Sequence, residues 1–199
     1  MLKNGTERYP LQVSTVEEYG VLDRTVHPLL APAGAAGPDP GPRERFAAAV
    51  NARLATSRKK DIFIYVHGYK VNFENPVLIA AELWHFLGYD GVFIPFAWPS
   101  RLGRLDYFGD TESARYSALF LREFLQFLAE ETDVEHINIL GYSAGTRLVA
   151  AALHQSALEN AGRSREDVRR RLRISDVILV GSDIDRGIFA TYLMDGMAR

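Results

Sequence analysis

A serine between two glycines stands where an apolar segment changes to a helix-forming one. Residues 137–153 read INILGYSAGTRLVAAAL, with Ser143 at the centre of the run GYSAG. Between a strand and a helix, this Gly-x-Ser-x-Gly spacing is typical of a tight turn that exposes a nucleophilic hydroxyl. The first N–H groups of the following helix would face an oxyanion formed beside the serine. The alternative interpretation is an unreactive turn serine.

A second glycine-containing segment follows another apolar run. KKDIFIYVHGY predicts a buried strand over 62–66, which ends at His67-Gly68-Tyr69. Acyl-transfer hydrolases place their second oxyanion donor in a loop of this kind, so we expect the backbone N–H groups of Tyr69 and Ala144 to form an oxyanion hole. A plain loop with a hydrogen-bonded histidine is the alternative.

A serine nucleophile normally needs a histidine to accept its proton, and the chain has 5 histidines. His154 follows Ser143 on the same expected helix by about 16 Å of rise, and His136 precedes it on the same expected strand by about 23 Å. His85 lies within a helical pattern and suits packing. The remaining sources of a base are His67, which ends the neighbouring strand, His27, and a histidine of a second subunit.

The acid of such a triad also has a candidate. Asp183 and Asp185 follow the apolar run that begins at 174, and Asp183 is placed to approach the same edge as the serine. A role for Asp183 as triad acid competes with helix capping or a local loop contact.

The elements that must position these residues alternate between strands and helices. Strands are expected in KKDIFIYVHGY, GVFIPFAWPS, VEHINILGYS and ISDVILVGSDID, and helices over 43–57, 74–88, 111–131, the segment after Ser143 and 163–173. Continuous apolar strands between helices favour an α/β fold with a mainly parallel sheet flanked by helices on both faces. Ligands bind beyond the carboxyl ends of such strands, where His67, Trp98, Ser143 and Asp183 fall.

The rest of the chain sets broad limits. Residues 8–30 contain β-compatible pieces, and 31–42, APAGAAGPDPGP, has the composition of an exposed loop.

The 199 residues suffice for one domain over 1–199, and the net charge of −2 gives no bulk attraction to nucleic acid. The chain has no cysteine, so disulfides and thiolate catalysis are excluded. The arginines of 163–173 are expected to form a solvated helix face, with anion binding as the alternative.

The motifs together resemble the α/β-hydrolases, and more narrowly a bacterial α/β-hydrolase-like family long catalogued as a domain of unknown function. The resemblance rests on FIYVHGYKVNFENP, GYDGVFIPFAWPS, DTESARYS, INILGYSAGTR and VILVGSDIDRGIF, which cover roughly residues 60–190. This chain has GYSAGTR where the family commonly has a His-Ser-Met-Gly-Asn-Arg run. The resemblance implies a Ser-His-acid hydrolase of esters. It also implies two further strands that usually carry the acid and the histidine, so we expect a C-terminally shortened α/β-hydrolase fold.

These observations predict a carboxylesterase- or lipase-like serine hydrolase that forms an acyl-enzyme on Ser143, takes a small-molecule ester and needs neither cofactor nor metal. A non-catalytic scaffold or truncated domain is the alternative. A sheet that stops at the fourth strand would expose an edge, which predicts a homodimer. MLKNGTERYP has no signal-peptide pattern and no run is long enough for a membrane span, so we expect a cytoplasmic protein.

Overall fold

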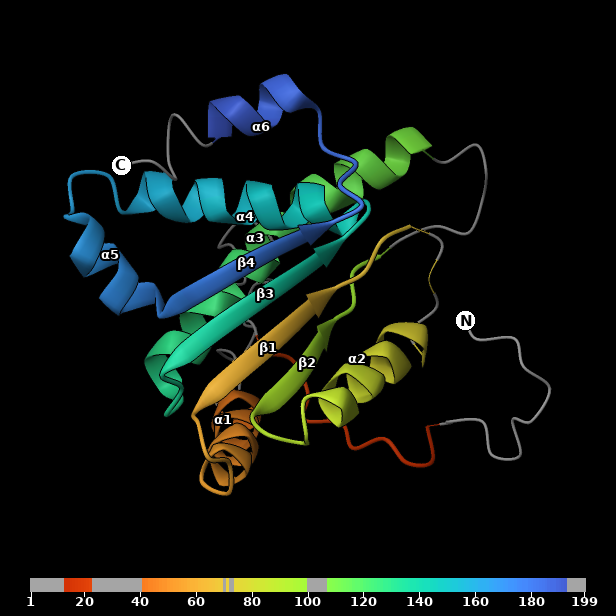
Figure 1. Ribbon diagram of the computed structural model, residues 1–199, viewed down its shortest axis with the longest axis vertical. Helices are drawn as coiled ribbons and strands as arrows, with labels where there is room; N and C mark the ends of the chain where they lie inside the picture. The colour runs from red at the N-terminus through yellow and green to blue at the C-terminus, as the bar shows by residue number, and fades with distance from the viewer. Residues whose placement is uncertain (1–12, 23–40, 70, 72–73, 100–106, 193–199) are drawn as a thin grey trace, which may run out of the picture.

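The computed structural model describes residues 13–22, 41–69, 71, 74–99 and 107–192, with side chains of its third helix from 116 onward. The elements follow one another as α1 (Gly41–Leu54), β1 (Asp61–Val66), α2 (Glu74–Phe86), β2 (Val92–Phe96), α3 (Tyr107–Glu131), β3 (His136–Tyr142), α4 (Gly145–Glu159), α5 (Arg165–Leu172), β4 (Ile174–Val180) and α6 (Arg186–Tyr192). Figure 1 shows the strands side by side in one twisted sheet.

The sheet is parallel throughout its described part and has the order β2-β1-β3-β4. The first strand, β1, therefore lies in the middle of the sheet; β2 is added on one side of it, and the chain then crosses back to place β3 on the other side. β1 and β3 are the two central strands, and their branched apolar residues Ile62, Ile64, Ile137 and Ile139 are almost fully buried. This confirms the α/β architecture expected from the sequence.

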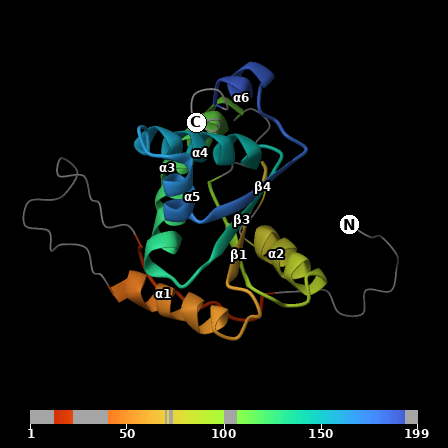
Figure 2. The same ribbon diagram turned by 60° about the vertical axis from the view of Figure 1, so that its left-hand side comes forward.

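The two faces of the sheet are covered to different extents. Helices α1, α3 and α4 lie on one face and α2 on the other, as Figure 2 shows. The first face carries the main core, which continues into α3 and α4 through Leu121, Leu125, Leu128 and Leu148. None of the described helices combines the length and the apolar character needed to cross a bilayer.

The second face is uncovered at β3 and β4 in the described part of the chain (Figure 1). Leu140 pairs with Ile178, and Tyr142 pairs with Val180, so these four side chains share this face. Tyr142, Ile178 and Val180 are exposed to 49%, 57% and 44%. β4 also forms one end of the described sheet. The homodimer expected through an open edge stays a prediction.

Several expected boundaries need correction. Residues 13–22, which lie within the segment that contains β-compatible pieces, form no strand. The exposed loop expected over 31–42 ends sooner, because α1 begins at Gly41 and Pro42 is buried in its first turn; residues 31–40 lie outside the described ranges. β2 ends at Phe96 rather than near Pro99, and α3 begins at Tyr107 rather than at 111. The helix over 163–173 is confirmed as α5, which has no buried residue.

Candidate active site

Ser143 occupies the turn between β3 and α4 with a left-handed backbone, φ +50°. A non-glycine residue rarely adopts this conformation, and the surrounding structure must hold it there. The serine N–H donates to the Val180 carbonyl at 2.9 Å, and the Ser143 carbonyl accepts from both the backbone N–H and the hydroxyl of Thr146. The turn is therefore fixed from both sides by β4 and α4.

The glycine after the serine is required by close packing. A Cβ built on Gly145 would lie 2.4 Å from the Val66 carbonyl oxygen and 2.6 Å from that of His67. These distances are far shorter than van der Waals contact. α4 can thus begin directly against the end of β1 only because residue 145 has no side chain.

A glycine of the neighbouring loop lies beside the serine. A Cβ built on Gly68 would be 3.0 Å from the Ser143 Cβ and 3.5 Å from its Oγ. The His67-Gly68-Tyr69 segment therefore passes along the serine side chain, where the sequence predicts the second oxyanion donor. Ala144, the other expected donor, is fully buried and directly precedes α4, where backbone N–H groups have no intrahelical acceptor.

His67 is buried and bonded at both ring nitrogens. Nδ1 lies 2.7 Å from the Gly68 carbonyl oxygen, and Nε2 lies 3.1 Å from the Trp98 backbone nitrogen. A carbonyl can only accept and a backbone N–H can only donate, so this pair of partners assigns a neutral ring with its proton on Nδ1. Burial lowers the pKa of His67, and the bond to the Gly68 carbonyl opposes this only in part.

Trp98 completes this arrangement from the end of β2. Its indole nitrogen donates to the His67 carbonyl at 2.7 Å, and its ring stacks on the imidazole at 5.5 Å between centroids. The ring of Tyr69 packs edge-on against Trp98. Trp98, which the sequence places at the carboxyl end of its strand, thus holds the loop that passes Ser143. With both nitrogens engaged, His67 has no lone pair available for the serine proton in this arrangement.

Asp183 lies close to the Ser143 turn, but its carboxylate contacts an arginine rather than a histidine. Its carboxylate is 3.3 Å from the Arg147 guanidinium, and its carbonyl accepts from the same guanidinium at 2.6 Å. Its backbone N–H points to the Thr146 hydroxyl. The structure therefore brings Asp183 to the serine's helix, with Arg147 rather than a histidine as its partner. Arg147 and Thr146, which were not singled out from the sequence, stand directly after the GYSAG run.

The other described histidines lie away from Ser143. His136 pairs with Asp61 at the opposite ends of the strands, at 3.0 Å, and His85 bonds to the Tyr89 hydroxyl at the end of α2. His154 stacks on Tyr192 nine residues into the unbroken helix α4. This agrees with the distances that set aside His136 and His154 and with the packing role expected of His85. His27 lies outside the described residues.

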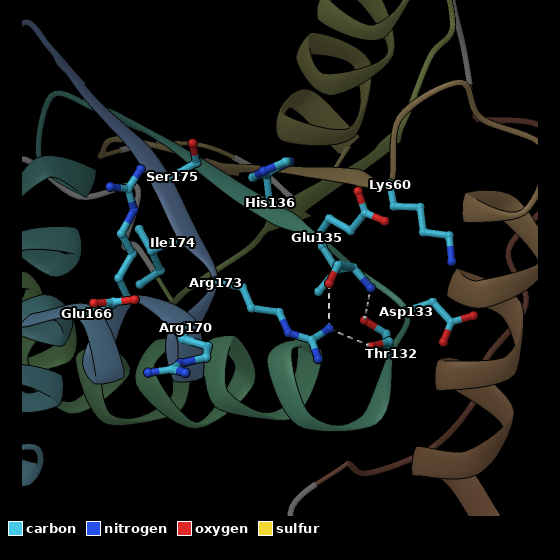
Figure 3. A pocket seen from close by; sticks show the side chains of 12 residues that line it. Lys60, Thr132, Asp133, Glu135, His136, Glu166, Arg170, Arg173, Ile174 and Ser175 are labelled. Atoms are coloured by element: carbon cyan, nitrogen blue, oxygen red, sulfur yellow. Dashed lines mark hydrogen bonds between the residues drawn. The ribbon is translucent and has the colours of Figure 1, made fainter.

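A hollow of about 660 Å³ lies at the amino ends of the strands, beside the residues that precede β3 and β4. Figure 3 shows side chains of both charge signs around it, with Arg173 donating to the carbonyls of Thr132 and Val134. Ligands of parallel sheets bind at the carboxyl ends of strands, so we assign the candidate site to Ser143 and not to this hollow. Within the described ranges, no three His, Asp or Glu residues gather to hold a metal ion.

The comparisons with known proteins agree with this geometry at the level of the family. No curated protein and no solved structure gives a match. Residues 43–198, which include every described helix and strand from the third residue of α1 to α6, match a family described as "Alpha/beta hydrolase of unknown function (DUF900)". The chain belongs to this family of α/β-hydrolases.

Proposed function

We propose that this α/β-hydrolase cleaves carboxylic esters through an acyl-enzyme on Ser143. The observation that carries the proposal is the left-handed backbone of Ser143 at the β3–α4 turn, with φ +50°. Strain of this kind persists where a side chain must be held outward against the local preference of the chain. Tyr89 and Arg173 also have left-handed backbones, so it is the combination of this conformation with the glycine loop packed along the Ser143 side chain that supports a nucleophile.

The chemistry follows from the groups around the turn. The Ser143 Oγ attacks the ester carbonyl carbon, its proton passes to a base, and the alcohol leaves with a proton returned by that base. The N–H groups of Ala144 and Tyr69 are proposed to bind the oxyanion, at the start of α4 and beside Gly68. Water then attacks the acyl-serine by the same route and releases the acid.

The base is the incomplete part of this site. His67 is proposed to be a positioning residue, because its nitrogens hold the loop to Trp98 and Gly68. His27 and a histidine of a second copy of the chain remain the candidates for proton acceptance. Asp183 is the proposed acid, and its contact with Arg147 would have to loosen for a histidine to approach.

The first experiment measures hydrolysis of short p-nitrophenyl esters and labelling by a fluorophosphonate, a reagent that phosphonylates activated serines. Ser143→Ala should lower the rate by at least about 10³-fold and abolish labelling. Ser175→Ala, an exposed serine near the start of β4, serves as the matched control and should change neither readout. Labelling of wild type at a residue other than Ser143 would contradict the proposal.

Two further variants locate the base. His27→Ala should remove hydrolysis, and mixing it with Ser143→Ala should restore part of the rate if the histidine acts across subunits. His67→Ala should also lower the rate, through displacement of the loop, but should leave some fluorophosphonate labelling. Wild type that is folded yet neither hydrolyses esters nor reacts with the fluorophosphonate would favour the non-catalytic scaffold instead.

A further inference from the structure

The turn between α2 and β2 presents large apolar side chains to solvent. Phe86, Leu87 and Tyr89 are exposed to 81%, 53% and 56%, and only Gly88 separates them. Apolar side chains gathered in this way on a surface often mark an interaction site, whereas single exposed ones are ordinary. The turn lies at the amino ends of the strands, opposite to Ser143.

The turn is held in one shape. The N–H groups of Leu87, Gly88 and Tyr89 donate to carbonyls of the last turn of α2, and Gly88 and Tyr89 both have left-handed backbones. The Tyr89 ring packs edge-on against Trp84 at 5.0 Å, and its hydroxyl bonds to His85. Phe86 and Leu87 therefore project from a fixed framework.

A basic loop is bonded to this turn. The backbone N–H and the guanidinium of Arg58 both donate to the Asp90 carboxylate, at 2.8 and 3.1 Å, and the Gly91 N–H donates to the Ser57 hydroxyl. Lys59 is exposed next to Arg58. The segment 57–60 and the segment 86–91 thus form one surface, which we call the apolar–basic tip.

The charges of this tip favour an anionic partner. Its one carboxylate, Asp90, is paired with Arg58, which leaves two further basic residues in the tip, Lys59 and Lys60. Arg53 lies over the Trp84 ring at 4.5 Å and adds a further cation beside the turn. Aromatic side chains with adjoining Lys and Arg are the combination that anchors proteins at the surface of anionic bilayers.

We propose that the apolar–basic tip docks this protein on an anionic phospholipid surface. Phe86 and Leu87 enter the boundary between headgroups and acyl chains, while Arg58 and Lys59 contact phosphate or carboxylate groups of the lipid. The opposite end of the sheet, with Ser143, would then face away from the bilayer. The proposal stands on the tip alone and does not depend on esterase activity.

The test is co-sedimentation with vesicles of phosphatidylcholine alone and of phosphatidylcholine with an equal part of phosphatidylserine. Wild type should bind the mixed vesicles and not the neutral ones. Lys59→Gln should weaken binding roughly fivefold, as expected for one basic residue near an anionic surface. Phe86→Ser should weaken it by about tenfold or more, because a large apolar contact is lost. Raising the salt from about 0.1 M to about 1 M should weaken it as well, because charge attraction is then screened over a few ångströms.

The matched control is Tyr116→Ser on α3, an aromatic residue with a similar exposure of 68% outside the tip. It should bind vesicles like wild type, and thermal melting of each variant checks that it is folded. Absence of binding to the mixed vesicles, or binding that Phe86→Ser leaves unchanged, would overturn the proposal. So would a dimer in sedimentation velocity that Phe86→Ser dissociates without any vesicle binding, since the tip would then bind a second copy.

Discussion

The two ends of the parallel sheet are built by different means. At the carboxyl end, Ser143 stands in a left-handed turn with Gly145 pressed against the end of β1, and the buried His67 is bonded at both nitrogens. At the amino end, loops with exposed charged and apolar side chains surround open hollows. Close backbone packing fixes the Ser143 turn at the first end, whereas exposed side chains cover much of the second. There, Gly91 but not Gly88 comes as close to backbone, since a Cβ built on Gly91 would lie 2.7 Å from the Asp61 carbonyl oxygen. The comparison teaches that tolerance to substitution should differ sharply between them.

The largest expected contrast is between two glycines. Gly145→Ala should destabilise the fold by about 3 kcal/mol or more, because the new methyl group would overlap two carbonyl oxygens of the β1 end. Gly88→Ala should cost only about 1 kcal/mol, since its φ of +74° is strained for alanine but nothing lies within 4 Å. Urea unfolding of both variants measures the difference. Equal losses would mean that the carboxyl end yields as easily as the amino end.

A smaller effect should come from acidification through His67. Burial lowers the pKa of His67 in the folded chain, so the unfolded chain binds its proton at a higher pH. The stability that this neutral histidine contributes is present above its unfolded pKa of about 6.5. It is lost as the pH falls below that value, by at most about 1.4 kcal/mol per pH unit.

The measurement is the free energy of unfolding of wild type and His67→Gln at pH 7.5 and 5.5. The variant should be less stable at pH 7.5 but should change less between the two pH values. The same pH dependence in both proteins would show that other groups take up the protons, and the interpretation of His67 as a neutral buried residue would fail.

The smallest effect is expected at the amino end, where His136 meets Asp61. The imidazole is 56% exposed, and ion pairs with exposed partners contribute little. Asp61→Asn should change the free energy of unfolding by less than about 0.5 kcal/mol at neutral pH. A loss above 1 kcal/mol by the same urea assay would mean that this end is organised more tightly than its exposure indicates.

The sequence was sufficient for the order of the four strands and of helices α1 to α5, and for the position of Ser143, whereas α6 was not expected. Alternating apolar strands and amphipathic helices reflect burial, which the sheet enforces, and the GYSAG run reflects a local turn. The role of His67 could not be read in the same way, because its two hydrogen bonds depend on Trp98, thirty-one residues away. The Asp183–Arg147 contact likewise depends on how β4 meets α4. The β-compatible residues within 13–22 form no strand, because such residues form strands only where a partner strand is available.

The bond from Ser143 to Val180 has a consequence for how the protein is made. Parallel strands have no local hairpins, so every pairing in this sheet closes a long stretch of chain. The serine turn is completed by β4, the last of the described strands in chain order, rather than by its immediate neighbours. During synthesis the segments GYSAG and HGY would therefore leave the ribosome well before their geometry is fixed, and the Ser143 turn would take its final shape only after residues near 180 have joined the sheet.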